Sequence, residues 1–134
     1  MNEGWCNKDY LVLFSKEEIL AKTKQYDVPA YLPGFRVIGL KGWDDFIVAD
    51  PKGRLFSVPT VPITKQHLQA FSFPSPLALE SDGRFLGRIK WYTQPIAFGG
   101  DPSVGANLIW VSHEEHVQLV NWWNKQYHER MSGA

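Results

Sequence analysis

The sequence is poor in cysteine and has no net charge. One cysteine, Cys6, occurs in 134 residues, so no disulfide can form within the chain. Fourteen Lys and Arg balance fourteen Asp and Glu. Because no excess of positive charge is present to attract DNA, RNA or an anionic membrane, we expect none of these as a partner. No histidine lies near Cys6 in the sequence to act as its base, so we interpret Cys6 as an unreactive thiol near a mobile terminus.

Long hydrophobic runs are also missing. The longest apolar stretches, such as residues 11–14, are far too short to cross a bilayer. Residues 1–9 are polar and lack the apolar centre of a signal peptide. These two absences predict a cytoplasmic protein with no membrane contact.

Aromatic residues, in contrast, are abundant. They make up 14% of the chain and include six Trp, within a hydrophobic content of 44%. That composition excludes a disordered chain, and the length predicts one domain over residues 1–134. Since a Trp side chain is large and apolar, we expect several Trp in the core and any exposed Trp on a binding surface.

Two helices are predicted from capping boxes, in which a serine lies three residues before a glutamate. They cover residues 16–26 and 113–130, and the serine–glutamate pairs are Ser15 with Glu18 and Ser112 with Glu115. The second helix carries an inward stripe at helical spacing. Its members are His116, Leu119, Val120, Trp123 and Tyr127.

Short runs rich in β-branched and aromatic residues, separated by Gly and Pro turns, predict an antiparallel sheet. The predicted strands are residues 35–40, 45–49, 54–58, 88–92, 95–98 and 107–111, and a short helix is predicted over residues 65–71. We place residues 95–98 at a sheet edge because Pro95 cannot donate a ladder hydrogen bond. The sequence therefore predicts an α+β fold. In it a twisted antiparallel sheet of about five or six strands packs against an N-terminal and a long C-terminal helix.

Motifs that would carry catalysis are weak. His113-Glu114-Glu115-His116 differs from the zinc-protease pattern, and we interpret it as a charged first helical turn. Residues 99–105 are glycine-rich, but a strand follows them where a phosphate loop needs a helix. We predict no metal, no cofactor and no catalytic residue. A small hydrolase with a His/Asp site remains an alternative, although we expect His113, His116 and an acid to lie apart.

Two features suggest a binding surface. Asp44 and Asp45 follow Trp43, and we interpret them as an acidic contact beside an exposed Trp. We expect the two carboxylates to diverge, because neighbouring residues of a strand point to opposite faces. Three basic residues lie near Trp91 and Tyr92, too few for a nucleic-acid site, so we interpret them as an exposed strand face. The predicted partner-binding residues are Trp43, Asp44, Asp45, Trp91, Tyr92 and Asp101.

Two stretches carry a family resemblance. Residues 31–50 read Tyr-Leu-Pro-Gly-Phe-Arg-Val-Ile-Gly, then a Gly-containing break, then Phe-Ile-Val-Ala-Asp. Residues 94–111 read Gln-Pro-Ile-Ala-Phe, a Gly-rich loop, then Gly-Ala-Asn-Leu-Ile-Trp-Val. In order and spacing they resemble the first sheet and the later Pro-Ile-Ala … Gly-Asn-x-Ile strand pair of the SUKH superfamily, small domains named after a yeast regulator of cell-wall assembly. Members usually carry Gly-Gly where this chain has Gly42-Trp43.

The resemblance implies an α+β fold with a twisted antiparallel sheet and no common active site or cofactor. Many bacterial members are immunity proteins that bind and neutralise a cognate secreted toxin. The leading hypothesis is therefore a non-catalytic, cytoplasmic immunity protein, either a monomer or a weak homodimer. The alternative is a regulatory or structural adaptor that binds an endogenous protein.

Overall fold

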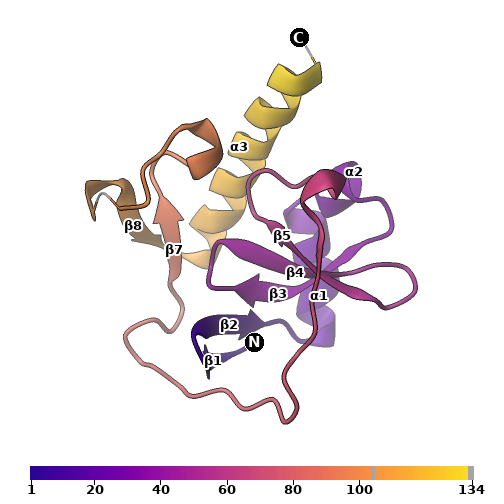
Figure 1. The fold of residues 1–134 in the computed structure, drawn as a ribbon, viewed down its shortest axis with the longest axis vertical. Helices are drawn as coiled ribbons and strands as arrows, with labels where there is room; N and C mark the ends of the chain where they lie inside the picture. Colours follow the sequence, from indigo (N-terminus) through magenta and orange to yellow (C-terminus); the bar gives the residue numbers. More distant parts are fainter. Residues whose placement is uncertain (104, 133–134) are drawn as a thin grey trace.

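A computed structural model describes residues 1–103 and 105–132 of the chain. In this part of the chain, eight strands form two antiparallel sheets beside three α-helices (Figure 1). The six strands of the larger sheet pair in sequence order. They are β1 (Asn2–Cys6), β2 (Asp9–Leu13), β3 (Arg36–Lys41), β4 (Asp45–Ala49), β5 (Leu55–Pro59) and β6 (Gln69–Ala70). The smaller sheet pairs β7 (Ile89–Tyr92) with β8 (Leu108–Val111).

The helices begin where the capping boxes predict. Helix α1 (Lys16–Gln25) starts after Ser15, whose side chain and that of Glu18 exchange hydrogen bonds with each other's backbone amides. The same exchange between Ser112 and Glu115 starts α3 (His113–Ser132). Between these two helices along the chain lies the short α2 (Val28–Tyr31). The α+β fold with a long C-terminal helix is therefore confirmed.

The N-terminal residues are not the mobile tail that their polarity predicts. They form a hairpin in which β1 pairs with β2, and β2 in turn pairs with β3. The turn is possible because Asn7 adopts a positive φ of 57°, a conformation that Asn tolerates better than most residues. Cys6 is part of this hairpin and is half-buried.

Two of the predicted elements are wrong. Residues 95–98 are not a strand, because Ile96–Phe98 form a 3-10 turn, η2, that closes with a hydrogen bond from the Phe98 amide to the Pro95 carbonyl. Residues 65–71 are not a helix, because only Lys65–His67 form a 3-10 turn, η1, before the chain enters β6. At the first place Pro95 favours a tight turn over a strand. At the second, the Leu68 residue that follows η1 is extended and the chain joins the sheet through β6.

Residues 71–88 cross from the larger sheet to β7 without regular structure, and we call them the strap (Figure 1). The strap is fixed to β1 by two backbone hydrogen bonds of 2.8 Å between Trp5 and Glu80. The Trp5 indole also donates to Asp82 at 3.0 Å. Gly4 allows this approach, because a Cβ there would lie 2.7 Å from the Glu80 carbonyl oxygen.

Trp43 joins the two sheets and is not the exposed residue that the sequence suggests. Its side chain is only 7% exposed, and its ring stacks on Tyr10 with centroids 4.7 Å apart. It meets three further aromatic rings edge-on, those of Trp5, Phe85 and Trp110. The β3–β4 turn places Trp43 inward, because Gly42 and Trp43 both adopt positive φ, 57° and 62°. This buried aromatic group connects β1, β2, the strap and β8.

Candidate functional site

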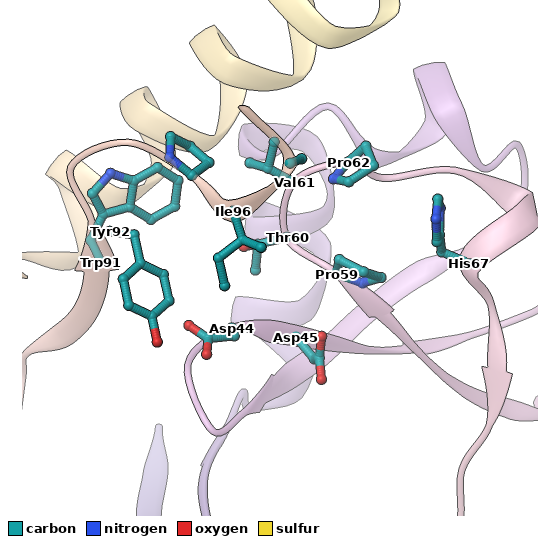
Figure 2. Close-up of a pocket in the computed structure, with 12 residues that line it drawn as sticks. Asp44, Asp45, Pro59, Thr60, Val61, Pro62, His67, Trp91, Tyr92 and Ile96 are labelled. Atoms are coloured by element: carbon teal, nitrogen blue, oxygen red, sulfur yellow. The ribbon is translucent and has the colours of Figure 1, made fainter. Parts of the chain in front are cut away.

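A groove of about 340 Å³ lies between the two sheets. One side is formed by the start of β4 and the chain leaving β5, and the other by β7 and the η2 turn (Figure 2). The lining residues are Asp44, Asp45, Pro59, Thr60, Val61, Pro62, His67, Trp91, Tyr92, Pro95, Ile96 and Ala97. The wall is thus mostly proline, aliphatic and aromatic, with two carboxylates on one rim. We call it the inter-sheet groove.

One wall of the inter-sheet groove is held in place by Asn124 of α3. The Asn124 side chain is fully buried and donates to the Thr60 carbonyl at 2.7 Å, while its oxygen accepts from the Ile63 amide at 2.7 Å. The Thr60 amide also donates to the Asp44 carbonyl at 3.0 Å. The segment between Thr60 and Ile63 is therefore fixed at both ends by the Asn124 side chain, and at Thr60 also by the backbone of Asp44.

Asp44 and Asp45 both line the inter-sheet groove, and their side chains extend in different directions along it (Figure 2). Asp44 belongs to the β3–β4 turn rather than to a strand, and only Asp45 begins β4. The alternation of side chains along a strand therefore does not apply to this pair. Figure 2 shows the two carboxylates on the same rim, with Tyr92 at one end of the groove and His67 at the other.

Asp44 is paired with Lys90 of β7. The Lys90 ammonium donates to the Asp44 carboxylate at 2.8 Å and lies 5.1 Å from the centre of the Tyr92 ring. Burial raises the pKa of Asp44 and outweighs the opposing effect of Lys90. At Lys90, burial acts to lower the pKa, but the hydrogen bond and the charge of Asp44 prevail, and the pKa is raised. The pair therefore holds the ammonium in its charged form.

Asp45 has no such partner. Within the described residues its half-buried side chain makes no hydrogen bond and no ion pair. Burial raises the pKa of Asp45, and the charges of Asp44 and Asp9 raise it further. The attraction of Lys41 and Lys90 lowers the pKa and only partly offsets these effects. The groove thus contains a carboxylate that has lost part of its water shell and forms no direct ion pair among the described residues, although its cross-strand neighbour Lys41 attracts it.

The remaining predicted residues divide between the groove and the rest of the surface. Trp91 and Tyr92 line the groove, but Trp91 is a wall residue with only 5% of its surface exposed, and its ring lies edge-on to that of His116. Asp101 is not among the lining residues. Its carboxylate accepts hydrogen bonds from the amide and hydroxyl of Ser103 in an exposed loop.

His116 of α3 belongs to the core of the domain. His116 is fully buried, and its Nδ1 lies 2.6 Å from the Tyr26 hydroxyl. Burial lowers the pKa of His116 to about 3, with a smaller effect from the charges of His113 and Lys22. In residues 1–103 and 105–132, no three His, Cys, Asp or Glu side chains gather as metal ligands.

Sequence reasoning misses Asn124 and the proline wall. Asn124 lies four residues after Val120 and eight after His116, so helical spacing alone places it on the buried face of α3. A polar residue at such a position needs buried hydrogen-bond partners, and this signal is present in the sequence. Pro59 and Pro62 predict the end of the sheet, since proline cannot donate a ladder hydrogen bond, and a proline pair next to a sheet edge also makes a rigid apolar surface.

A second hollow, of about 430 Å³, lies where the β1–β2 turn faces the strap. Its lining includes Cys6, Lys8, Lys41 and Phe71, and the Lys41 ammonium lies 5.8 Å from the centre of the Phe71 ring. Unlike the inter-sheet groove, it brings together none of the predicted partner-binding residues.

Searches with protein-family models, curated proteins and solved structures gave no match to this chain. Of the helices in the described residues, none combines the length and the apolar character needed to cross a bilayer.

Proposed function

We propose that this chain is a non-catalytic protein-binding domain and that the inter-sheet groove is its main contact surface. The observation that carries this proposal is the mostly apolar groove wall with an unpartnered, half-buried carboxylate on its rim. Ile96 adds to it, because this aliphatic side chain is 53% exposed and lies in the groove. Binding is favoured when a partner covers the apolar wall and places a positive charge beside the partly dehydrated carboxylate.

As partner we propose a cognate secreted toxin, which the chain binds and neutralises in the cytoplasm of a bacterium. The support is the resemblance of residues 31–50 and 94–111 to the SUKH superfamily. These two stretches also supply both sides of the groove, with Asp44 and Asp45 in the first and Ile96 in the second. Neutralisation follows if the domain covers the catalytic surface of the toxin or holds the toxin in an inactive state.

A regulatory adaptor that binds an endogenous protein is the alternative, and it uses the same groove. The two differ in the consequence of binding, because an immunity protein protects a cell from its partner and an adaptor does not. We therefore suggest co-expressing the chain with the product of each neighbouring gene. Formation of a complex and survival of cells that express the partner support immunity. A complex with a non-toxic protein supports the adaptor, and absence of both complex and protection contradicts the proposal.

A matched pair of variants tests the surface. Ile96→Glu places a charge in the groove, whereas Leu20→Glu places one on α1 at a side chain that is 70% exposed and outside the groove. We expect Ile96→Glu to abolish the complex and Leu20→Glu to leave it intact, with both variants folded by circular dichroism. Equal effects of the two substitutions would mean that the groove is not the contact surface.

A further inference from the structure

We propose that the inter-sheet groove receives a basic side chain, arginine or lysine, from a polypeptide segment of the partner. This inference rests on the proposed protein-binding function and specifies the chemistry that the partner presents. Three properties of the groove lead to it. They are the charge on its rim, the apolar character of its wall, and the poor match of both to a metal ion.

The charge on the rim favours a cation. Asp44 and Asp45 lie next to each other, and the ammonium of Lys90 is bound to Asp44. Asp45 is left with its carboxylate half-buried and without a hydrogen bond among the described residues. A cation that enters the groove stabilises the ionised form of Asp45, which partial burial has destabilised.

The wall favours a cation with a long apolar stem. Pro59, Pro62 and Ile96 present aliphatic surface, and the ring of Tyr92 lies at the end of the groove near Asp44 (Figure 2). The methylene stem of Arg or Lys packs on such surface while its charged head reaches an acidic rim. Figure 2 shows Asp44, Asp45 and Pro59 on the β4–β5 side of the groove and Ile96 and Tyr92 on the β7 side, so apolar surface and carboxylates border the same space.

A metal ion matches the groove less well. Calcium and magnesium require about six oxygen ligands, and a site for them is built from several carboxylates, carbonyls and waters. The inter-sheet groove supplies the carboxylates of Asp44 and Asp45 from one rim and otherwise mostly carbon. An organic cation contacts both the carboxylates and the apolar wall, whereas a metal ion binds only the carboxylates.

The test is a titration of the ¹⁵N-labelled full chain with N-acetyl-arginine amide, followed by heteronuclear NMR. N-acetyl-citrulline amide is the control, because it has the same shape without the charge. We expect the arginine probe to shift the amides of Val61, Tyr92 and Ile96, with millimolar affinity as suits so small a ligand. Citrulline should bind at least about tenfold more weakly. Equal binding of the two probes, or shifts confined to another surface, would overturn the inference.

Two variants locate the charge that matters. Asp45→Asn keeps the shape of the side chain and removes its charge, whereas Glu114→Gln makes the same change at an exposed position of α3 outside the groove. Binding of the arginine probe should fall by about tenfold or more in Asp45→Asn and stay within about twofold in Glu114→Gln. An unchanged affinity in Asp45→Asn contradicts the inference.

This experiment separates the inference from the proposed function. If the arginine probe binds as described but no neighbouring gene product forms a complex or is neutralised, the proposed function fails and the groove chemistry stands. If a complex forms and Asp45→Asn leaves its affinity unchanged, the groove chemistry fails and the protein-binding function stands.

Discussion

The hydroxyl of Tyr26 lies 2.6 Å from Nδ1 of His116, and both side chains are completely buried. Burial raises the pKa of Tyr26 and lowers that of His116, so both groups are neutral. The tautomer of the neutral imidazole determines which of the two atoms donates in this hydrogen bond, and Nε2 of His116 has no partner in the described residues. This contact ties the C-terminus of α1 to the first turn of α3.

The His116 contact predicts acid sensitivity. The pKa of His116 is about 3 in the folded chain, and a histidine in an unfolded chain has a pKa of about 6.5. Only the unfolded state takes up this proton between these values. The stability due to neutral His116 is therefore complete above pH 6.5 and falls toward pH 3 by up to about 1.4 kcal/mol per pH unit. Urea unfolding at several pH values measures the slope, which should be shallower in His116→Gln. Equal slopes would contradict the prediction.

Asn124 gives a second prediction, because its amide is both donor and acceptor for the groove wall. Asn124→Asp keeps the acceptor for Ile63 but cannot donate to Thr60, and it buries a charge. We expect the free energy of unfolding to fall by about 3 kcal/mol or more, measured with urea at pH 7. Gln118→Glu, an exposed amide-to-acid change on the same helix, should change it by less than about 0.5 kcal/mol. A similar small effect at Asn124 would exclude its clamping role.

The position of Trp43 predicts an unusual order of stability for two variants, Trp43→Gly and Trp43→Ala. Its ring is buried, so Trp43→Ala should lose about 3–5 kcal/mol of unfolding free energy. Its φ of 62° is disfavoured for Ala but not for Gly. Trp43→Gly should therefore be more stable than Trp43→Ala by about 0.5–1 kcal/mol, although Gly normally costs stability. Thermal and urea unfolding of the two variants check the order. The prediction would be contradicted if Trp43→Ala were more stable than Trp43→Gly.

Asp45 predicts a gain in stability on loss of charge. A carboxyl whose pKa is raised in the folded chain destabilises the fold as pH rises through that pKa. At pH 7, Asp45→Asn should therefore have a higher melting temperature than the natural chain, and its free energy of unfolding should be larger by less than about 1 kcal/mol. Near pH 3 the difference should vanish, because Asp45 is then protonated. A lower melting temperature for Asp45→Asn at pH 7 would show that the carboxylate stabilises the chain.

The elements that could be predicted from the sequence are those fixed by local chemistry. Capping boxes place the starts of α1 and α3, and β-branched runs place β3, β4 and β5 close to their true bounds. The hairpin of β1 and β2 is local, but the sequence does not predict it, because residues 1–9 are polar and lack the β-branched run typical of a strand. The bridge from Trp5 to Glu80 could not be predicted, because the two residues lie far apart in the sequence. The 3-10 turn at Ile96–Phe98 has the apolar composition of a strand, and only its tertiary setting decides between the two.

Part of the candidate site could also be predicted from the sequence, because residue type alone indicates it. Residue type predicts an acidic and aromatic surface, and two of the residues named for it, Asp45 and Tyr92, line the groove. Residue type does not distinguish a Trp that binds from a Trp that fills the core. The backbone conformation of the β3–β4 turn decided this for Trp43 and also brought Asp44 beside Asp45.

The bond between the strap and β1 has a consequence for self-association. An uncovered sheet edge is a template on which another chain can add a strand and start a fibre. Glu80 occupies the backbone donor and acceptor of Trp5, the fourth of the five residues of β1, and β6 at the opposite edge offers only two residues. A chain in which the strap is cut or lengthened thus loses its protection against growth into polymers, even though its core is unchanged.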